Sequence, residues 1–98
     1  MTVDKKKDGA NCTVLVSGRL DTTTAPELDA AVKEDIEAIS ELIIDFAQLE
    51  YISSAGLRVL LSCQKIMNVN GKMIIKNVND TIMEVFEITG FNDILTIE

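Results

Sequence analysis

This chain of 98 residues is 47% hydrophobic and 26% charged, which is the composition of a folded globular protein, and we expect one domain over residues 1–98. Nine basic against 16 acidic residues give a net charge of −7, which disfavours binding to nucleic acid or to an anionic membrane. No apolar run approaches the roughly 20 residues of a membrane span, so we expect no membrane insertion. The basic N-terminal residues lack the apolar segment of a secretory signal, which favours a cytoplasmic location.

The residue types that are missing restrict the chemistry. The sequence has no histidine, which excludes Ser-His-Asp and Cys-His nucleophile systems and histidine-containing metal sites. No G-x-x-x-x-G-K phosphate loop is present either. Cys12 and Cys63 lie far apart in apolar segments, so we expect buried free thiols in a reducing compartment rather than a disulfide. The sequence therefore predicts no enzyme, no catalytic residue, no metal site and no cofactor.

The N-terminal third predicts two strands followed by a helix. A strand near Thr2–Lys5 is expected to pair as a hairpin, through a turn at Asp8-Gly9, with a β-branched strand over Cys12–Ser17. The basic cluster Lys5–Lys7 is interpreted as a solvated turn. A helix is expected to begin near Pro26, because proline is favoured in the first helical turn. Its outer face is acidic, and its apolar face comprises Leu28, Ala31, Val32, Ile36 and Ile39.

The central third predicts a strand, a loop and a second helix. The consecutive apolar residues of Glu41–Phe46 indicate a central strand covered on both faces, and Ala47–Ile52 is interpreted as a loop. The second helix is expected over Ala55–Asn68, with Gly71 as its stop. Its buried side is predicted to comprise Leu57, Leu60, Leu61, Cys63 and Met67.

The C-terminal third predicts one more strand and one more helix. Lys72–Val78 is the strand, and Asn79-Asp80 is expected to cap a helix over Thr81–Thr89 that ends at Gly90. Phe91–Ile97 is interpreted as a last edge strand. The order (β)βαβαβα predicts an α/β fold with a mixed, mostly parallel sheet and helices packed on it.

The junction between the central strand and the second helix is the segment with the clearest functional signal. Ligands and partners of open α/β sheets bind at the carboxyl ends of the strands, where this junction lies. Ser53 or Ser54 stands at the N-cap position, and Gly56 follows inside the helix. One interpretation is structural: a capping serine and a glycine that packs tightly against the sheet. The other is a regulatory phosphorylation site, because a helix N-terminus tolerates a phosphate.

Three motifs in this order resemble the STAS domain of bacterial anti-sigma factor antagonists, and the resemblance covers nearly the whole chain. The motifs are Gly18-Arg19-Leu20-Asp21 with Thr24-Ala25, then Leu42–Phe46 with Ser53-Ser54-Ala55-Gly56-Leu57, and last Phe86–Phe91. The resemblance implies a STAS-type fold. It also implies an antagonist that binds an anti-sigma factor, itself a serine kinase, and so frees the sigma factor. Phosphorylation by that kinase cancels binding, and a PP2C-type phosphatase restores it.

The same resemblance implies the residues of the site. Aligned on Gly56-Leu57, the phosphoacceptor falls at Ser54. Many family members have aspartate where this chain has Ser53, and Ser53 therefore remains a second candidate for modification. Asp21 corresponds to an acidic residue near the site. The implied partner-binding residues are Asp21, Thr22, Ser53, Ser54, Ala55, Gly56, Leu57 and Arg58.

A second function is compatible with the same motifs. Single STAS domains also resemble the accessory subunit of bacterial lipid-transport ABC systems, where the loop packs constitutively on an ATPase. The exposed edge strand expected at the N-terminus is compatible with a monomer or a weak dimer.

Overall fold

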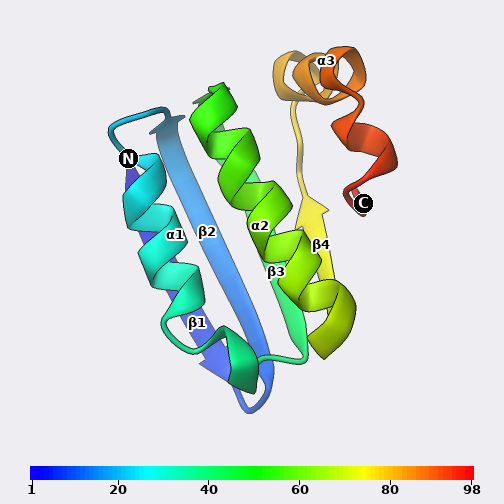
Figure 1. Cartoon of the computed structure of the whole chain (residues 1–98). Coiled ribbons are helices and arrows are strands. Elements are labelled where there is room, and N and C mark those ends of the chain that lie inside the picture. The colour runs from blue at the N-terminus through cyan, green and yellow to red at the C-terminus, as the bar shows by residue number, and fades with distance from the viewer.

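Strands and helices alternate in the order ββαβαβα in the computed structural model, which describes residues 1–98 (Figure 1). This is the predicted order. The elements are β1 Thr2–Asp8, β2 Asn11–Leu20, α1 Ala25–Lys33, β3 Glu41–Ile52, α2 Ser54–Asn70, β4 Lys72–Lys76 and α3 Asp80–Thr89. Two short 3₁₀ turns, Ile36–Ala38 and Phe91–Asp93, follow α1 and α3.

The four strands form a single sheet in the order β1-β2-β3-β4. The strands β1 and β2 are an antiparallel hairpin, whereas β2 pairs with β3, and β3 with β4, in parallel. The predicted mixed, mostly parallel sheet is therefore confirmed. Parallel neighbours need crossover connections, which α1 and α2 supply, and right-handed crossovers place both helices on the same side of the sheet.

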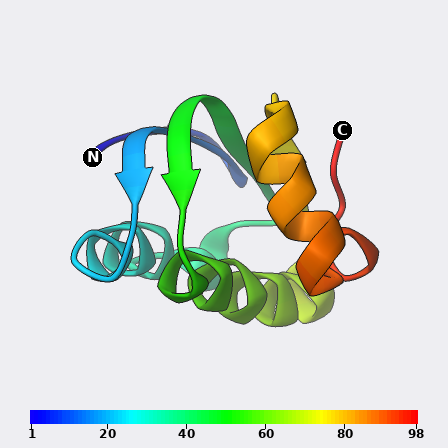
Figure 2. The same ribbon diagram turned by 90° about the horizontal axis from the view of Figure 1, so that it is seen from above.

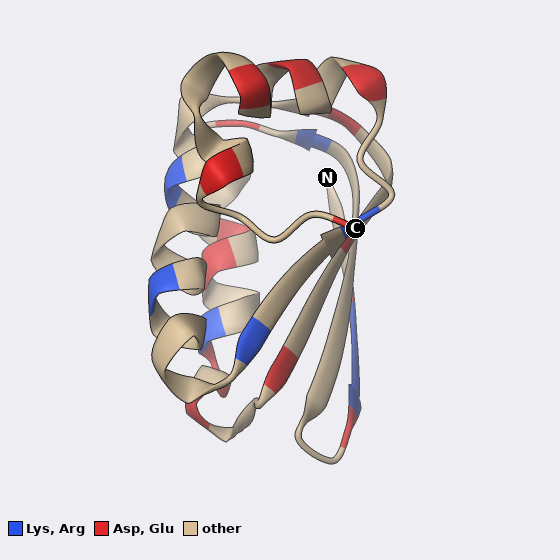
Figure 3. Cartoon of the chain, turned by 90° about the vertical axis from the view of Figure 1, so that its right-hand side faces the viewer, with Lys and Arg blue, Asp and Glu red and all other residues tan.

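The prediction that the central strand is covered on both faces is wrong. Seen from above and from the side, α1 and α2 lie on one face of the sheet and no helix covers the other (Figures 2 and 3). Burial alternates accordingly along the first half of β3: Leu42 and Ile44 are fully buried, whereas Ile43 is half-buried. Ile43 lies on the open face of the sheet, between its register partners Thr13 on β2 and Ile74 on β4. A consecutive apolar run was thus compatible with a strand that buries one face and shields the other only partly.

The segment Ala47–Ile52, predicted as a loop, continues β3. Its pairing with β2 is interrupted by register shifts between Leu15 and Ser17 and between Gly18 and Arg19. Bulges of this kind add residues to one strand and break the alternation of inward and outward side chains. The buried residues Leu49 and Ile52 are consequently three positions apart, so the sequence lacks the alternating pattern by which a strand is recognised.

The helix α1 is shorter than predicted and ends at Lys33. Ile36 and Ile39 are buried as expected, but from the 3₁₀ turn and the residue after it. Asp35 leaves the helical conformation and pairs with Lys5 and Lys7 of β1, at 2.6 Å from Lys5 Nζ. The interpretation of the lysine cluster as a solvated turn is therefore wrong, because its three members lie in β1 and two of them bind the carboxylate of Asp35.

The C-terminal segment forms the predicted edge strand only at its very end. Its first residues make local bonds instead: the Asp93 N–H donates to the Gly90 carbonyl, and the Leu95 N–H donates to the Phe91 carbonyl. Its last residues pair with β4 in parallel around one bridge between Ile75 and Ile97: the Ile75 N–H donates to the Thr96 carbonyl and the Glu98 N–H to the Ile75 carbonyl, both at 2.9 Å. The strands β1 and β2 each extend three residues beyond their predicted ends, and the remaining boundaries agree to within two residues. The helices α2 and α3 end at Gly71 and Gly90 as predicted.

The two cysteines are buried and unpaired, as predicted. Burial raises the pKa of the Cys63 thiol to about 11, and burial also raises that of Cys12. Neither thiol is therefore ionised to any useful extent near neutral pH.

None of the helices has both the length and the apolar character needed to cross a bilayer.

Candidate functional site

The structure brings the two predicted site segments together at one edge of the sheet. The parallel strands β2 and β3 end side by side, and Leu20 pairs with Ile52. Directly beyond them, the Ser53 N–H donates to the Leu20 carbonyl at 2.9 Å. The loop that contains Asp21 and the start of α2 at Ser54 are therefore adjacent, as parallel strands require.

Asp21 shapes the loop between β2 and α1. Its Oδ1 accepts hydrogen bonds from the N–H groups of Thr23 at 3.0 Å and Thr24 at 3.1 Å. These bonds, led by that from Thr24, lower the pKa of the Asp21 carboxyl because they favour its charged form. The hydroxyl of Thr24 donates to the Arg19 carbonyl at 2.8 Å. Asp21 thus fixes the loop that exposes Thr22, and one of its carboxylate oxygens is fully engaged in doing so.

Ser53 and Ser54 lie in different environments although they are neighbours. Ser53 is the N-cap residue of α2, but its side chain makes no capping hydrogen bond, contrary to the expectation for a serine there. Its Oγ is buried and has no partner. Ser54 is the first residue of the helix and is exposed. The first helical N–H groups, which have no intrahelical acceptor, are therefore left without a side-chain cap beside an exposed hydroxyl.

Gly56 allows the start of α2 to lie close to the sheet. A Cβ at this position would lie 2.7 Å from Leu20 Cγ and 2.8 Å from Ile52 Cγ1, closer than carbon atoms pack. The predicted tight packing of this glycine is confirmed. Leu57 is also buried, at 6% exposure, and contributes to the core. Of the predicted partner-binding residues, Gly56 and Leu57 therefore lie beneath the surface that Ser54 and Arg58 present.

A shallow groove between α1 and α2 begins next to this surface. It has a volume of about 440 Å³, and its lining includes Thr22, Arg58 and Val59. Lys33 crosses the groove, with its Nζ 2.8 Å from Asp29 Oδ1 and 2.6 Å from Ser62 Oγ. The sequence reasoning missed this bridge, although the spacing of Asp29 and Lys33 by four residues on one helix is a signal for an ion pair.

A stacked pair flanks the loop on the sheet side. The Arg19 guanidinium lies 4.1 Å from the centroid of the Tyr51 ring, and Tyr51 is 39% exposed. These residues are register partners on β2 and β3. The pair could not be found without that register, which the bulges in β3 obscure.

Comparison with known proteins identifies the fold family. The model of the STAS domain family matches residues 2–98 of the chain. The protein belongs to the STAS domain family. This STAS domain is 31% identical over 100 residues to an anti-sigma-B factor antagonist of Listeria monocytogenes, covering 96% of this chain and 84% of that protein.

Solved STAS domains have the same fold. The unphosphorylated form of the anti-sigma factor antagonist SpoIIAA gives a TM-score of 0.85 at 20% identity, over 99% of this chain and 88% of that one. The phosphorylated form of SpoIIAA, a Bacillus cell fate determinant, gives 0.79 at 20% identity, over 99% and 91% of the two chains. The predicted STAS-type fold is confirmed.

The chemistry available at the site is that of a surface hydroxyl. No group of three or more cysteine, aspartate or glutamate side chains capable of holding a metal ion occurs in the structure. The exposed Ser54 hydroxyl stands at a helix start whose N–H groups carry partial positive charge. Such a hydroxyl can accept a phosphoryl group from another protein, and the helix start can tolerate the resulting charge.

Proposed function

We propose that this STAS domain is an anti-sigma factor antagonist controlled by phosphorylation of Ser54. In its unphosphorylated state it binds an anti-sigma factor that is also a serine kinase, and the sigma factor is thereby released. The observation that carries the proposal is the exposed Ser54 hydroxyl at the uncapped start of α2, next to the loop held by Asp21. The curated relative from Listeria, named as an anti-sigma-B factor antagonist, supports the same activity.

Phosphorylation transfers one group between two proteins. The kinase holds ATP, and a bond forms between Ser54 Oγ and the γ-phosphorus as the bond from that phosphorus to the bridging oxygen breaks. ADP leaves, and the hydroxyl proton passes to a base of the kinase. A PP2C-type phosphatase hydrolyses the phosphoserine and returns the free hydroxyl.

The phosphate acts by changing the charge of the contact surface. It adds about two negative charges at neutral pH where the partner must approach within contact distance. The site is at a helix N-terminus, so the charge does not unfold α2. Binding is therefore lost through repulsion and desolvation at the interface, while the domain keeps its fold.

Burial favours Ser54 over Ser53 as the phosphoacceptor. The Oγ of Ser53 is buried, so a kinase could reach it only after the start of α2 had opened. Ser54 is exposed in the folded domain and needs no such opening. The cytoplasm, where anti-sigma kinases and ATP are found together, is the expected location, in keeping with two buried free thiols.

The experiment is intact-mass analysis after incubation with ATP and a purified anti-sigma factor serine kinase from the same organism. The wild type, Ser54→Ala and Ser53→Ala are treated in parallel. We expect one added phosphate on the wild type and on Ser53→Ala, and none on Ser54→Ala. Kinase binding should persist in Ser54→Ala and fall at least about tenfold in Ser54→Asp.

Other outcomes would redirect the proposal. A phosphate absent only from Ser53→Ala would keep the function and move the site by one residue. If no variant is phosphorylated and the wild type co-purifies stoichiometrically with an ABC ATPase, the protein is a constitutive accessory subunit instead. Equal kinase binding by Ser54→Ala and Ser54→Asp would refute the switch.

A further inference from the structure

The helix that begins at the phosphorylation site has an unusual charge. In a chain with a net charge of −7, α2 contains no aspartate or glutamate and carries two cations, Arg58 and Lys65. A phosphate on Ser54 would therefore have no carboxylate on its own helix and one arginine nearby.

Arg58 is a cation without a committed partner. It is exposed, and no carboxylate lies within 4.0 Å of it, whereas Lys5, Lys7, Arg19, Lys33 and Lys72 all have one. Two acidic groups on neighbouring elements are already engaged. Asp29, which lines the same groove, pairs with Lys33, and Asp21 Oδ1 accepts the N–H groups of its own loop.

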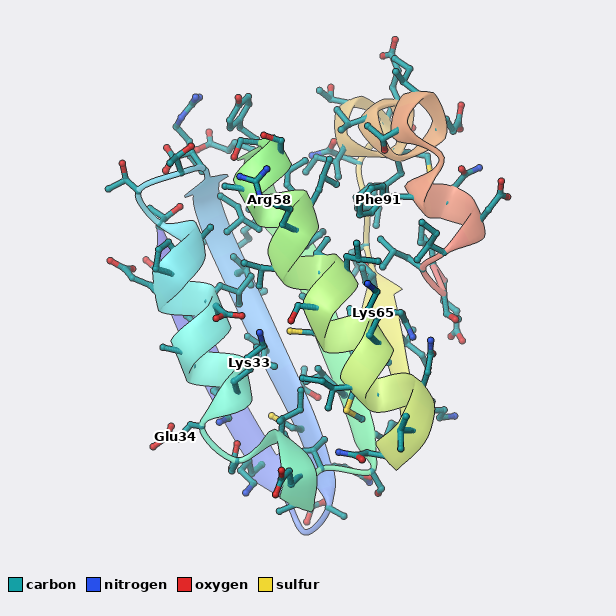
Figure 4. The ribbon with its side chains drawn as sticks, viewed as in Figure 1. Lys33, Glu34, Arg58, Lys65 and Phe91 are labelled. Atoms are coloured by element: carbon teal, nitrogen blue, oxygen red, sulfur yellow. The ribbon has the colours of Figure 1, made fainter.

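Helix geometry places Arg58 over Ser54. The two residues are four positions apart on α2, so they share one face with Cβ atoms about 5–6 Å apart. Helical side chains lean toward the N-terminus, which directs the long arginine side chain back over the turn that contains Ser54. Arg58 is drawn near the N-terminal end of α2, on the side away from the sheet (Figure 4).

Lys65 is the natural comparison on the same helix. It is also exposed and has no ion-pair partner, but it is about 16 Å further along the axis than Ser54. Its ammonium cannot reach a phosphate at the start of α2. The two residues therefore test the effect of position at equal charge.

We propose that Arg58 is the intramolecular ligand of the phosphate on Ser54. The inference rests on the proposed function in that Ser54 is the modified residue. The guanidinium offers two parallel N–H donors to two phosphate oxygens, a geometry that arginine matches and lysine does not. Phosphorylation would then do two things at once. It adds negative charge to the contact surface, and it withdraws the one free cation that the unphosphorylated domain presents there.

A nearby guanidinium favours the phosphate dianion over the monoanion. Arg58 should therefore lower the second pKa of phosphoserine 54 from its ordinary value of about 6. A favourable pair at this spacing is expected to shift the titration midpoint downward by about 0.2–0.4 pH units. The shift should shrink as salt is added, because the pair is exposed.

The test is a ³¹P NMR titration of the full chain with phosphoserine incorporated at position 54 during translation. This route needs no kinase, so failure of the kinase to act on Ser54 would count against the proposed function and leave this result unaffected. The proteins compared are the wild type, Arg58→Gln, Arg58→Lys and Lys65→Gln. Thermal unfolding of the unphosphorylated forms checks that the exposed substitutions leave the fold intact.

We expect a midpoint about 0.2–0.4 pH units higher in Arg58→Gln than in the wild type, an intermediate value in Arg58→Lys, and the wild-type value in Lys65→Gln. Equal midpoints for the wild type and Arg58→Gln would overturn the proposal. If Arg58→Gln did not fold, the ¹⁵N shift of Arg58 Nε with and without the phosphate decides: a change supports the contact, and an unchanged signal refutes it.

Discussion

The helices α2 and α3 both begin with a polar N-cap residue, but the two helix starts are capped differently. At α3, the Asn79 side chain accepts the N–H of Ile82 at 2.9 Å, and Asp80 places a carboxylate in the first turn. At α2, the N-cap Ser53 makes no such bond, and the first turn contains no acidic residue. Both helices follow strands of one sheet, so the difference does not come from the type of connection.

The start of α3 is therefore capped by its own side chains, whereas the start of α2 has no side-chain cap. Asn79 also donates through Nδ2 to the Leu49 carbonyl at 3.0 Å, which ties α3 to β3. The start of α2 is positioned by packing instead, through Gly56 against Leu20 and Ile52. Its N–H groups and the Ser54 hydroxyl stay available, which is what a site for a phosphate and a partner requires.

Among the substitutions that test this comparison, Gly56→Ala is expected to change the stability most. The added Cβ meets the middle of two buried side chains, and overpacking of this kind destabilises by about 1–3 kcal/mol. The better helix propensity of alanine offsets up to about 1 kcal/mol. Because the Cβ would meet two buried side chains at 2.7 and 2.8 Å, the cost is expected at the upper end of that range. We therefore expect a net loss of about 2 kcal/mol in the free energy of unfolding, measured by urea denaturation. Ser54→Ala, an exposed change two residues away, is the control, and an equal stability of both variants would show that packing does not position α2.

A smaller effect distinguishes the two N-caps directly. Asn79→Ala removes a capping bond and the bond to Leu49, and should destabilise by about 1–2 kcal/mol. Ser53→Ala removes a hydroxyl that caps nothing, so its change should stay within about 0.5 kcal/mol. Urea denaturation of the two variants side by side measures the difference. A loss in Ser53→Ala as large as that in Asn79→Ala would mean that Ser53 does cap α2 in solution.

The fold was predictable where the signals are local. Asn79 marks a helix start through its capping side chain, Gly90 marks a helix end through its left-handed φ of 80°, and the turn at Asp8-Gly9 marks the hairpin. The errors arose where the outcome depends on a distant strand. The second half of β3 pairs with β2 through bulges, and only the last residues of the run that follows Gly90 reach β4, after a 3₁₀ turn.

The candidate site, too, was predictable from local signals but not where it depends on distant contacts. The spacing of Ser54, Gly56 and Arg58 on one helix could be read from the sequence, and so could the adjacency of the two loops once parallel strands were assumed. The burial of the Ser53 hydroxyl could not, because it depends on how α2 is seated on Leu20 and Ile52. Nor could the pairing of Asp35 with Lys5 and Lys7, which required the end of α1 to lie over β1.

The smallest expected effect concerns the loop before α1, in which the Asp21 carboxylate accepts the N–H groups of Thr23 and Thr24. The fold lowers the pKa of the Asp21 carboxyl, chiefly through the hydrogen bond from the Thr24 N–H. The charged carboxylate therefore stabilises the fold above its unfolded-state pKa of about 4. This stabilisation is lost as the pH falls through the lower pKa of the folded state. Asp35 is shifted in the same direction, mainly by Lys5, and contributes to the same acid loss. Asp21→Asn should therefore reduce, without abolishing, the fall in urea midpoint between pH 7 and pH 3. Thr22→Ala in the same loop keeps the carboxylate and should retain the full fall, and an unchanged fall in Asp21→Asn would show that the loop is held without the Asp21 charge.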